Sequence, residues 1–147
     1  MGKLLLITGI AFLGFTGAVN AQSCSCNGPA QIKSAADLTS KLVGNTVCVG
    51  STPTFEAQEQ HVTGGTLIDF KRGPGHPTDP TKTIGTWVTS GDSGKTIVTY
   101  NYTGGSSSYS YNVCTSGTND LGFCPSGTNT PTVNAKLKSG LVGCLIK

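Results

Sequence analysis

Apolar and polar positions alternate along most of the chain beyond residue 45, which is the period expected of half-buried β-strands. The alternating stretches are rich in Thr, Val, Ile and Tyr, and turns rich in Gly, Asp and Ser separate them. The pattern predicts strands over 46–49, 55–62, 66–72, 83–89, 96–103, 109–114 and 132–137. Residues 115–131 show no such pattern and are expected to form a loop.

One segment, residues 34–43, has the apolar spacing of a helix instead. Ala35, Leu38 and Leu42 fall on one face at this spacing. Ser34 precedes the segment as a candidate N-cap, and Gly44 stands where a C-terminal glycine is favoured. We expect this helix to pack on the sheet as a lid or plug.

Together these elements predict a mainly β fold. The strands follow one another through short turns, such as the two-residue turn at Gly64-Gly65, which favours an antiparallel meander. The meander is expected either to stay an open sheet or to curl into a small barrel, with one short N-terminal helix before it.

The first 21 residues have the pattern of a secretory signal peptide. Lys3 supplies a positive charge, an apolar run of about 16 residues follows, and small residues close it at Val19-Asn20-Ala21. A membrane span needs roughly 20 mostly apolar residues, so cleavage before Gln22 is the preferred interpretation. Residues 22–147 are then expected to form a single secreted domain, extracellular or periplasmic, with no membrane span.

Six cysteines lie beyond residue 21, and an even set in a secreted chain predicts a disulfide framework. They are Cys24, Cys26, Cys48, Cys114, Cys124 and Cys144. The sequence does not choose among the pairings, although the short, turn-rich intervening segment favours Cys114 with Cys124. The other four would then tie the two ends of the chain to the sheet.

The small net charge of the chain argues against nucleic acid as a partner. The net charge of +3 falls to +2 without Lys3, and the basic residues are scattered, so we expect no nucleic-acid binding. The Cys24-x-Cys26 spacing does not match zinc sites, and we expect neither a metal nor a cofactor.

Two short motifs resemble those of known families. Gly91-Asp92-Ser93-Gly94 is similar to the nucleophile signature of chymotrypsin-like serine proteases, but the resemblance covers four residues, and a turn between strands explains them. Gly85-Thr86-Trp87 resembles the Gly-x-Trp motif of calycin barrels such as lipocalins and avidins, although in those families it lies near the first strand. We interpret Trp87 as a core or helix-packing residue.

The candidate binding residues are mostly aromatic. Tyr100 and Tyr102 share one strand face, as do Tyr109 and Tyr111, and a hairpin around Gly104-Gly105 would place 102 opposite 109 and 100 opposite 111. This four-tyrosine patch is interpreted either as a core face or as a surface that contacts a ligand.

Glu59 and His61 share a face of another strand, and with Trp87 they complete the candidate ligand-binding set. His61 is expected to be a surface or edge residue. Glu56 falls on the opposite face from Glu59, which argues against a pair of glutamates acting across a cleft.

Three functions stay open. The preferred hypothesis is a small secreted, non-enzymatic binding or interaction domain for an unknown extracellular ligand or protein, with no catalytic residue assigned. The alternatives are a structural protein of the cell surface or extracellular matrix, and a small secreted hydrolase or hydrolase inhibitor. A tyrosine-lined pocket would favour the first, a long unpaired strand edge the second, and converging ionisable groups the third.

Overall fold

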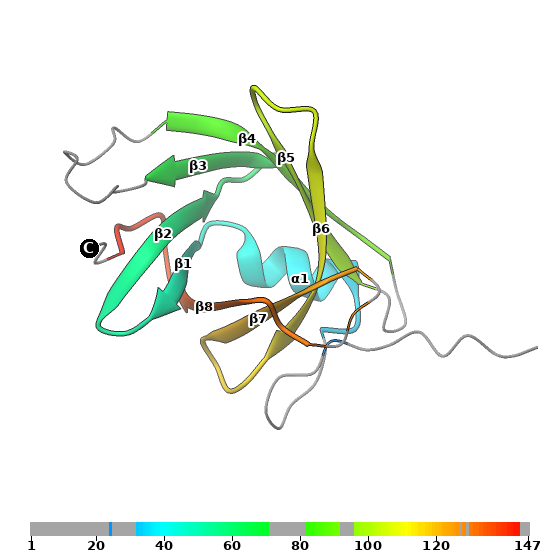
Figure 1. Cartoon of the computed structure of the whole chain (residues 1–147), viewed down its shortest axis with the longest axis vertical. Helices are drawn as coiled ribbons and strands as arrows, with labels where there is room; N and C mark the ends of the chain where they lie inside the picture. Colours follow the sequence, from blue (N-terminus) through cyan, green and yellow to red (C-terminus); the bar gives the residue numbers. More distant parts are fainter. Residues whose placement is uncertain are drawn as a thin grey trace, which may run out of the picture.

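The computed structural model describes residues 24, 32–70, 82–91, 96–126, 128 and 130–144. These residues form an antiparallel closed barrel of eight strands, in which each strand pairs with the next and β8 pairs with β1 (Figure 1). The elements are α1 (Ala35–Leu42), β1 (Thr46–Ser51), β2 (Thr54–His61), β3 (Thr66–Phe70), β4 (Lys82–Ser90), β5 (Ile97–Tyr102), β6 (Ser108–Thr115), β7 (Asp120–Pro125) and β8 (Val133–Lys138). The predicted mainly β meander with one helix is therefore confirmed, and it closes.

The expectation of a loop over residues 115–131 is wrong, because β7 lies within it. Leu121 and Phe123 point into the barrel, while Gly122 and Cys124 face outward, so the strand has the ordinary alternation. Its apolar stretch is short and Gly- and Ser-rich segments flank it. Pairing with β6 and β8 on both sides defines the strand.

Two glycines are required by close backbone packing. A Cβ atom on Gly85 would lie 2.1 Å from the carbonyl oxygen of Asn101 on β5. Gly65, in the β2–β3 turn, has a φ of +84°, and its added Cβ would lie 2.9 Å from the carbonyl oxygen of Trp87. The close approach of β5 therefore explains why the Gly85-Thr86-Trp87 motif has a glycine at its first position.

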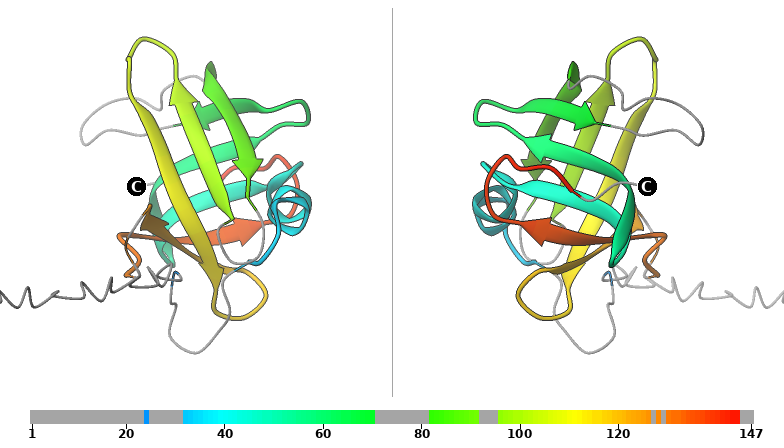
Figure 2. Two further views of the ribbon diagram at one scale, coloured as in Figure 1. Left: turned by 90° about the vertical axis from the view of Figure 1, so that its right-hand side faces the viewer. Right: turned by 90° about the vertical axis from the view of Figure 1, so that its left-hand side faces the viewer.

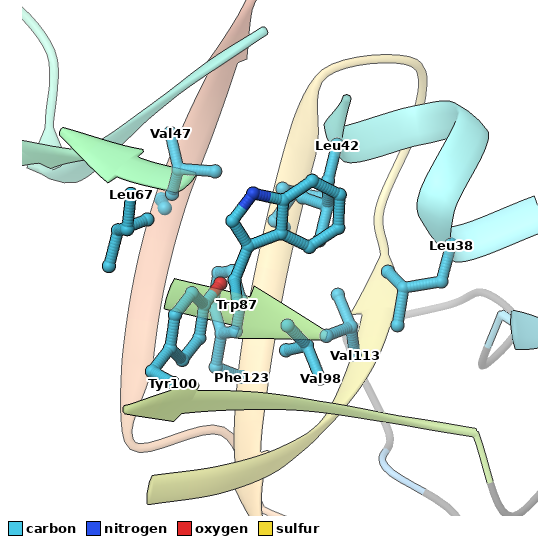
Figure 3. Close-up of a cluster of buried hydrophobic side chains, with 11 residues drawn as sticks. Leu38, Leu42, Val47, Leu67, Trp87, Val98, Tyr100, Val113 and Phe123 are labelled. Carbon is cyan, nitrogen blue, oxygen red and sulfur yellow. The ribbon is translucent and has the colours of Figure 1, made fainter. Parts of the chain in front are cut away.

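Helix α1 plugs one end of the barrel, as predicted. Ser34 caps it, since its Oγ accepts a hydrogen bond from the Asp37 N–H at 3.1 Å. Leu38 and Leu42 are fully buried and point toward the indole of Trp87 in the centre of the core (Figure 3). The helix therefore seals the barrel at the end where the β2–β3 and β6–β7 turns lie.

The C-terminal segment, residues 139–144, runs along the outside of the wall formed by β1 and β2 (Figure 2). A disulfide joins Cys144 to Cys48 on β1. The Cys144 N–H donates to Oε1 of Gln58 at 2.6 Å, and the Val142 N–H donates to Oγ1 of Thr46 at 3.0 Å. The segment thus buries outward-facing polar side chains and satisfies them, and the prediction that Cys144 ties down this end is confirmed.

A second disulfide joins Cys24 to Cys124 on β7, so the predicted Cys114–Cys124 pairing is wrong. The two partners are 100 residues apart in the sequence, and Cys24 is held against the outer wall of the barrel. Cys114 is also disulfide-bonded, and its sulfur lies within 4.8 Å of those of Cys24 and Cys124. Oxidised sulfurs are not the thiolates that bind metals, so the cluster is explained as neighbouring disulfides.

Several sequence predictions fall outside the described residues. They are the signal peptide over 1–21, Cys26 and the turn at Asp92-Ser93-Gly94. Among the residues that are described, no helix has the length and apolar character needed to cross a membrane.

Candidate functional site

A pocket of about 160 Å³ lies inside the barrel, in the half away from α1. Its lining comes from β1, β2 and β5 to β8, and consists of Val47, Val49, Glu59, Tyr100, Tyr102, Tyr111, Phe123 and Val133. A wider hollow of about 500 Å³ adjoins it at the β5–β6 turn and shares Tyr102 and Tyr111 with it. The structure thus brings three of the four predicted tyrosines onto one pocket, and Tyr109 lines the adjoining hollow.

The tyrosines become more exposed from the pocket floor to its mouth. Tyr100 is 3% exposed and belongs to the core, whereas Tyr109 is 47% exposed at the rim. Tyr102 and Tyr111 are partly buried between them. The patch is therefore core at one end and accessible at the other.

The predicted register of these tyrosines is wrong by two residues. Tyr100 lies opposite Tyr109, and Tyr111 lies opposite Val98, so the pairing is centred between Gly104 and Gly105, whereas the predicted pairs are centred one residue later in the chain. The rings nevertheless meet diagonally. The Tyr102 and Tyr109 ring centroids are 5.9 Å apart, and those of Tyr100 and Tyr111 are 6.2 Å apart. Long aromatic side chains reach such diagonal neighbours across a sheet.

Glu59 is the charged group of the pocket lining. The Tyr102 hydroxyl donates to Glu59 Oε1 at 2.5 Å. Burial raises the pKa of Glu59 from 4.5 to about 7; the hydrogen bond from Tyr102 opposes this shift and the charge of Asp69 adds to it. Asp69 lies directly opposite Glu59 on β3. Glu56 is exposed, at the point where the β1–β2 register shifts between Phe55 and Ala57.

His61 lies below the pocket, and the expectation of a surface or edge position is wrong. Its side chain is fully buried, with Nδ1 3.2 Å from the Glu59 carbonyl oxygen and Nε2 3.0 Å from the Tyr100 hydroxyl. Burial lowers the pKa of His61 to about 4, so the ring is neutral at ordinary pH. A carbonyl only accepts, so Nδ1 carries the proton and Nε2 accepts from Tyr100.

Trp87 also lies below the pocket rather than on its lining. Its ring contacts that of His61 edge-on at a centroid distance of 5.1 Å, and its Nε1–H donates to the Val62 carbonyl at 3.3 Å. Trp87 and His61 belong to the predicted binding set but do not line the pocket. They pack beneath Tyr100, whose ring forms the bottom of the pocket.

The phenol groups keep their protons over the physiological range. Burial is the main cause that raises the pKa of Tyr100, Tyr102 and Tyr111, and the charge of Glu59 raises all three further. The pocket therefore presents neutral hydroxyls and ring faces next to one carboxyl group.

Sequence reasoning missed the aliphatic part of the lining. Val47 and Val49 alternate inward on β1, and Val133 does so on β8. Their period of two was visible, but only barrel closure places β1 and β8 side by side opposite the tyrosines. Phe123 was missed because its strand was not predicted.

A larger hollow of about 470 Å³ lies elsewhere, on the outer side near the β1–β2 turn and the β7–β8 strands. Its charged groups, Asp120 and Lys136, already form an ion pair with each other, and both side chains are well exposed. It offers polar surface without a buried polar group or an aromatic face. The smaller internal pocket is therefore the stronger candidate site.

No protein-family model, curated protein or solved structure matches this chain.

Proposed function

We propose that the protein is a small secreted, non-enzymatic binding protein that takes a small molecule into the tyrosine-lined half of its barrel. The observation that carries this proposal is the internal pocket of about 160 Å³, lined by aromatic and aliphatic side chains with one carboxyl group and phenol hydroxyls. Concave, mostly apolar sites with few polar groups are typical of small-molecule binding.

Closure of the barrel argues against the structural alternative. Every described strand pairs on both sides, so the described sheet leaves no open edge on which copies could assemble. The N-terminal signal pattern supports an oxidising extracellular or periplasmic location. The disulfides Cys24–Cys124 and Cys48–Cys144 support the same location.

A hydrolase is the second candidate, because Glu59 and Asp69 lie opposite each other on β2 and β3. A carboxyl group with a pKa of about 7 suits general acid catalysis. Against this candidate, Glu59 is already bonded to Tyr102, and its neighbours in the lining are apolar or phenolic.

The test is a fragment screen on the oxidised protein by saturation-transfer NMR, repeated on two variants. Val49→Phe fills the pocket, whereas Val88→Phe adds the same ring to an exposed position on the outer face of β4. We expect fragments to bind wild type and Val88→Phe but not Val49→Phe, with circular dichroism showing that all three are folded. Binding that persists in folded Val49→Phe, or no binding to wild type, would reject the proposal.

A further inference from the structure

The charged side chain that lines the pocket is acidic. Among the described residues that line it, Glu59 is acidic and none is basic. Asp69 adds a second carboxyl group behind Glu59, directly across the β2–β3 pair. Lys82 on β4 lies opposite Asp69 in the strand register, but it is exposed and is not part of the described lining. An anionic ligand would therefore meet the Glu59 carboxyl group without a basic side chain among the described lining residues.

The rings of the lining are inclined to one another. Tyr111 and Phe123 meet at 87° with centroids 6.0 Å apart, and Tyr100 and Phe123 meet at 53° with centroids 6.5 Å apart. The Tyr100 ring also meets the Tyr111 ring at 57°. Rings set at such angles present faces and edges in several directions around one space. The electron-rich faces of aromatic rings attract cations, most strongly where water is excluded.

The carboxyl group is held in place for an incoming partner. The Tyr102 hydroxyl donates to Glu59 Oε1, and Tyr102 itself spans the pocket and its mouth. This bond leaves the acceptor capacity of a carboxylate only partly used, since its two oxygens can accept several hydrogen bonds. A donor with a positive charge is the partner that such a group binds most strongly.

We propose that the pocket selects a small organic cation, an amine or quaternary ammonium group on a compact apolar body. The cation would sit between the Glu59 carboxylate and the faces of Tyr100, Tyr102 and Tyr111, and the apolar body would contact Val47, Val49 and Val133. This inference rests on the proposed function and names its ligand class. Long acyl chains are disfavoured, because Trp87 and α1 close the barrel below Tyr100.

Binding of such a cation is expected to be linked to proton release. Burial keeps the pKa of Glu59 near 7 in the empty pocket, so about half of the molecules carry a neutral carboxyl group at neutral pH. A bound cation stabilises the carboxylate and lowers this pKa. The other titratable groups that face Glu59 are Asp69 on β3, Tyr100 and Tyr102 on β5 and Tyr111 on β6.

The test compares four probes that share a phenyl ring by isothermal titration calorimetry at about pH 8, where Glu59 is mostly ionised. Benzylamine and benzyltrimethylammonium are cations, benzyl alcohol is neutral and benzoate is an anion. We expect at least one cation to bind about tenfold or more tightly than benzyl alcohol, and benzoate to bind weakest.

Two glutamine variants localise the effect. Glu59→Gln keeps an acceptor for Tyr102 but removes the charge, and it should weaken cation binding by about tenfold or more while leaving benzyl alcohol within about twofold. Glu56→Gln removes the same charge from an exposed position of the same strand, outside the pocket lining, and should change nothing. Equal losses in both variants would overturn the inference, because the effect would then come from net charge.

Different results would overturn the cation selectivity and the proposed binding function. If benzyl alcohol or benzoate binds as tightly as the cations, or if none of the four probes binds, the cation inference is overturned. The proposed function falls only if the fragment screen is negative as well, or if binding survives in folded Val49→Phe.

Discussion

The Tyr100 hydroxyl and the Nε2 atom of His61 lie 3.0 Å apart beneath the pocket, and both side chains are buried. This pair joins β5 to β2 across the barrel interior. Tyr100→Phe removes the hydroxyl and leaves a buried ring nitrogen without its donor, so we expect a loss of about 1–3 kcal/mol in the free energy of unfolding. Urea unfolding measures it. Tyr109→Phe, at the exposed rim, is the control and should cost less than about 0.5 kcal/mol.

Glu59 and His61 should produce opposite pH dependences of stability. The pKa of Glu59 is raised from 4.5 to about 7 in the folded state, so its contribution to stability is lost as the pH rises between these values. The pKa of His61 is lowered from 6.5 to about 4, so its contribution is gained as the pH rises over that range. Each shift corresponds to about 3 kcal/mol, and the two largely cancel between about pH 4.5 and 6.5.

Glu59→Gln should expose the His61 effect. In this variant the free energy of unfolding should rise by up to about 3 kcal/mol from about pH 4.5 to 6.5, whereas wild type stays nearly flat. Urea unfolding over a pH series measures both curves, and Glu56→Gln should run parallel to wild type. Parallel curves for Glu59→Gln and wild type would show that Glu59 titrates alike in the folded and unfolded states.

The disulfide between Cys48 and Cys144 should stabilise the protein without shaping its pocket. The bridge and the segment that it holds lie on the outer wall, where they cover Gln58. Replacing both cysteines by alanine should cost about 2–5 kcal/mol of unfolding free energy. Any ligand found in the pocket should keep its affinity within about threefold, measured by calorimetry below the lowered melting temperature. A lost pocket affinity in the folded variant would contradict this separation.

Helix α1 should contribute through its two core leucines. Leu42→Ala removes a fully buried side chain next to Trp87 and should cost about 2–5 kcal/mol. Leu141→Ala, at a position that is 46% exposed, is the matched control and should cost less than about 0.5 kcal/mol. Chemical unfolding followed by Trp87 fluorescence reports both. A small effect of Leu42→Ala would mean that the barrel is stable without its plug.

The helix and most strands could be predicted, because caps, apolar spacing and turns depend on residues close together in the sequence. The Ser34 cap and the leucine spacing of α1 appear where the sequence places them. The Gly64-Gly65 turn does too, although it spans three residues, 63–65, rather than two. The failures are non-local. His61 becomes buried only when the barrel closes around it, β7 is defined by its two neighbours, and Cys124 finds Cys24 rather than nearby Cys114.

In the candidate site, too, some features follow from the local sequence and others only from the closed barrel. The tyrosine faces and the inward position of Glu59 follow from strand alternation, which needs only the sequence. The depth of each tyrosine does not follow from alternation, since Tyr100 and Tyr109 lie opposite each other and yet one is buried by the closed barrel and the other is exposed at the rim. Nor does the sequence show that the valines of β1 and β8 complete the lining.

The pairing of β1 with β8 has a consequence for how fast the chain can fold. It joins Val47 to Leu137, so the final set of ladder hydrogen bonds must wait until both ends of the barrel sequence meet. Folds dominated by such distant pairings are slow, because the entropy of closing the loop is lost before the contacts form. An oxidised chain, in which Cys48 and Cys144 are joined across 96 residues, starts the search with these strands already held together.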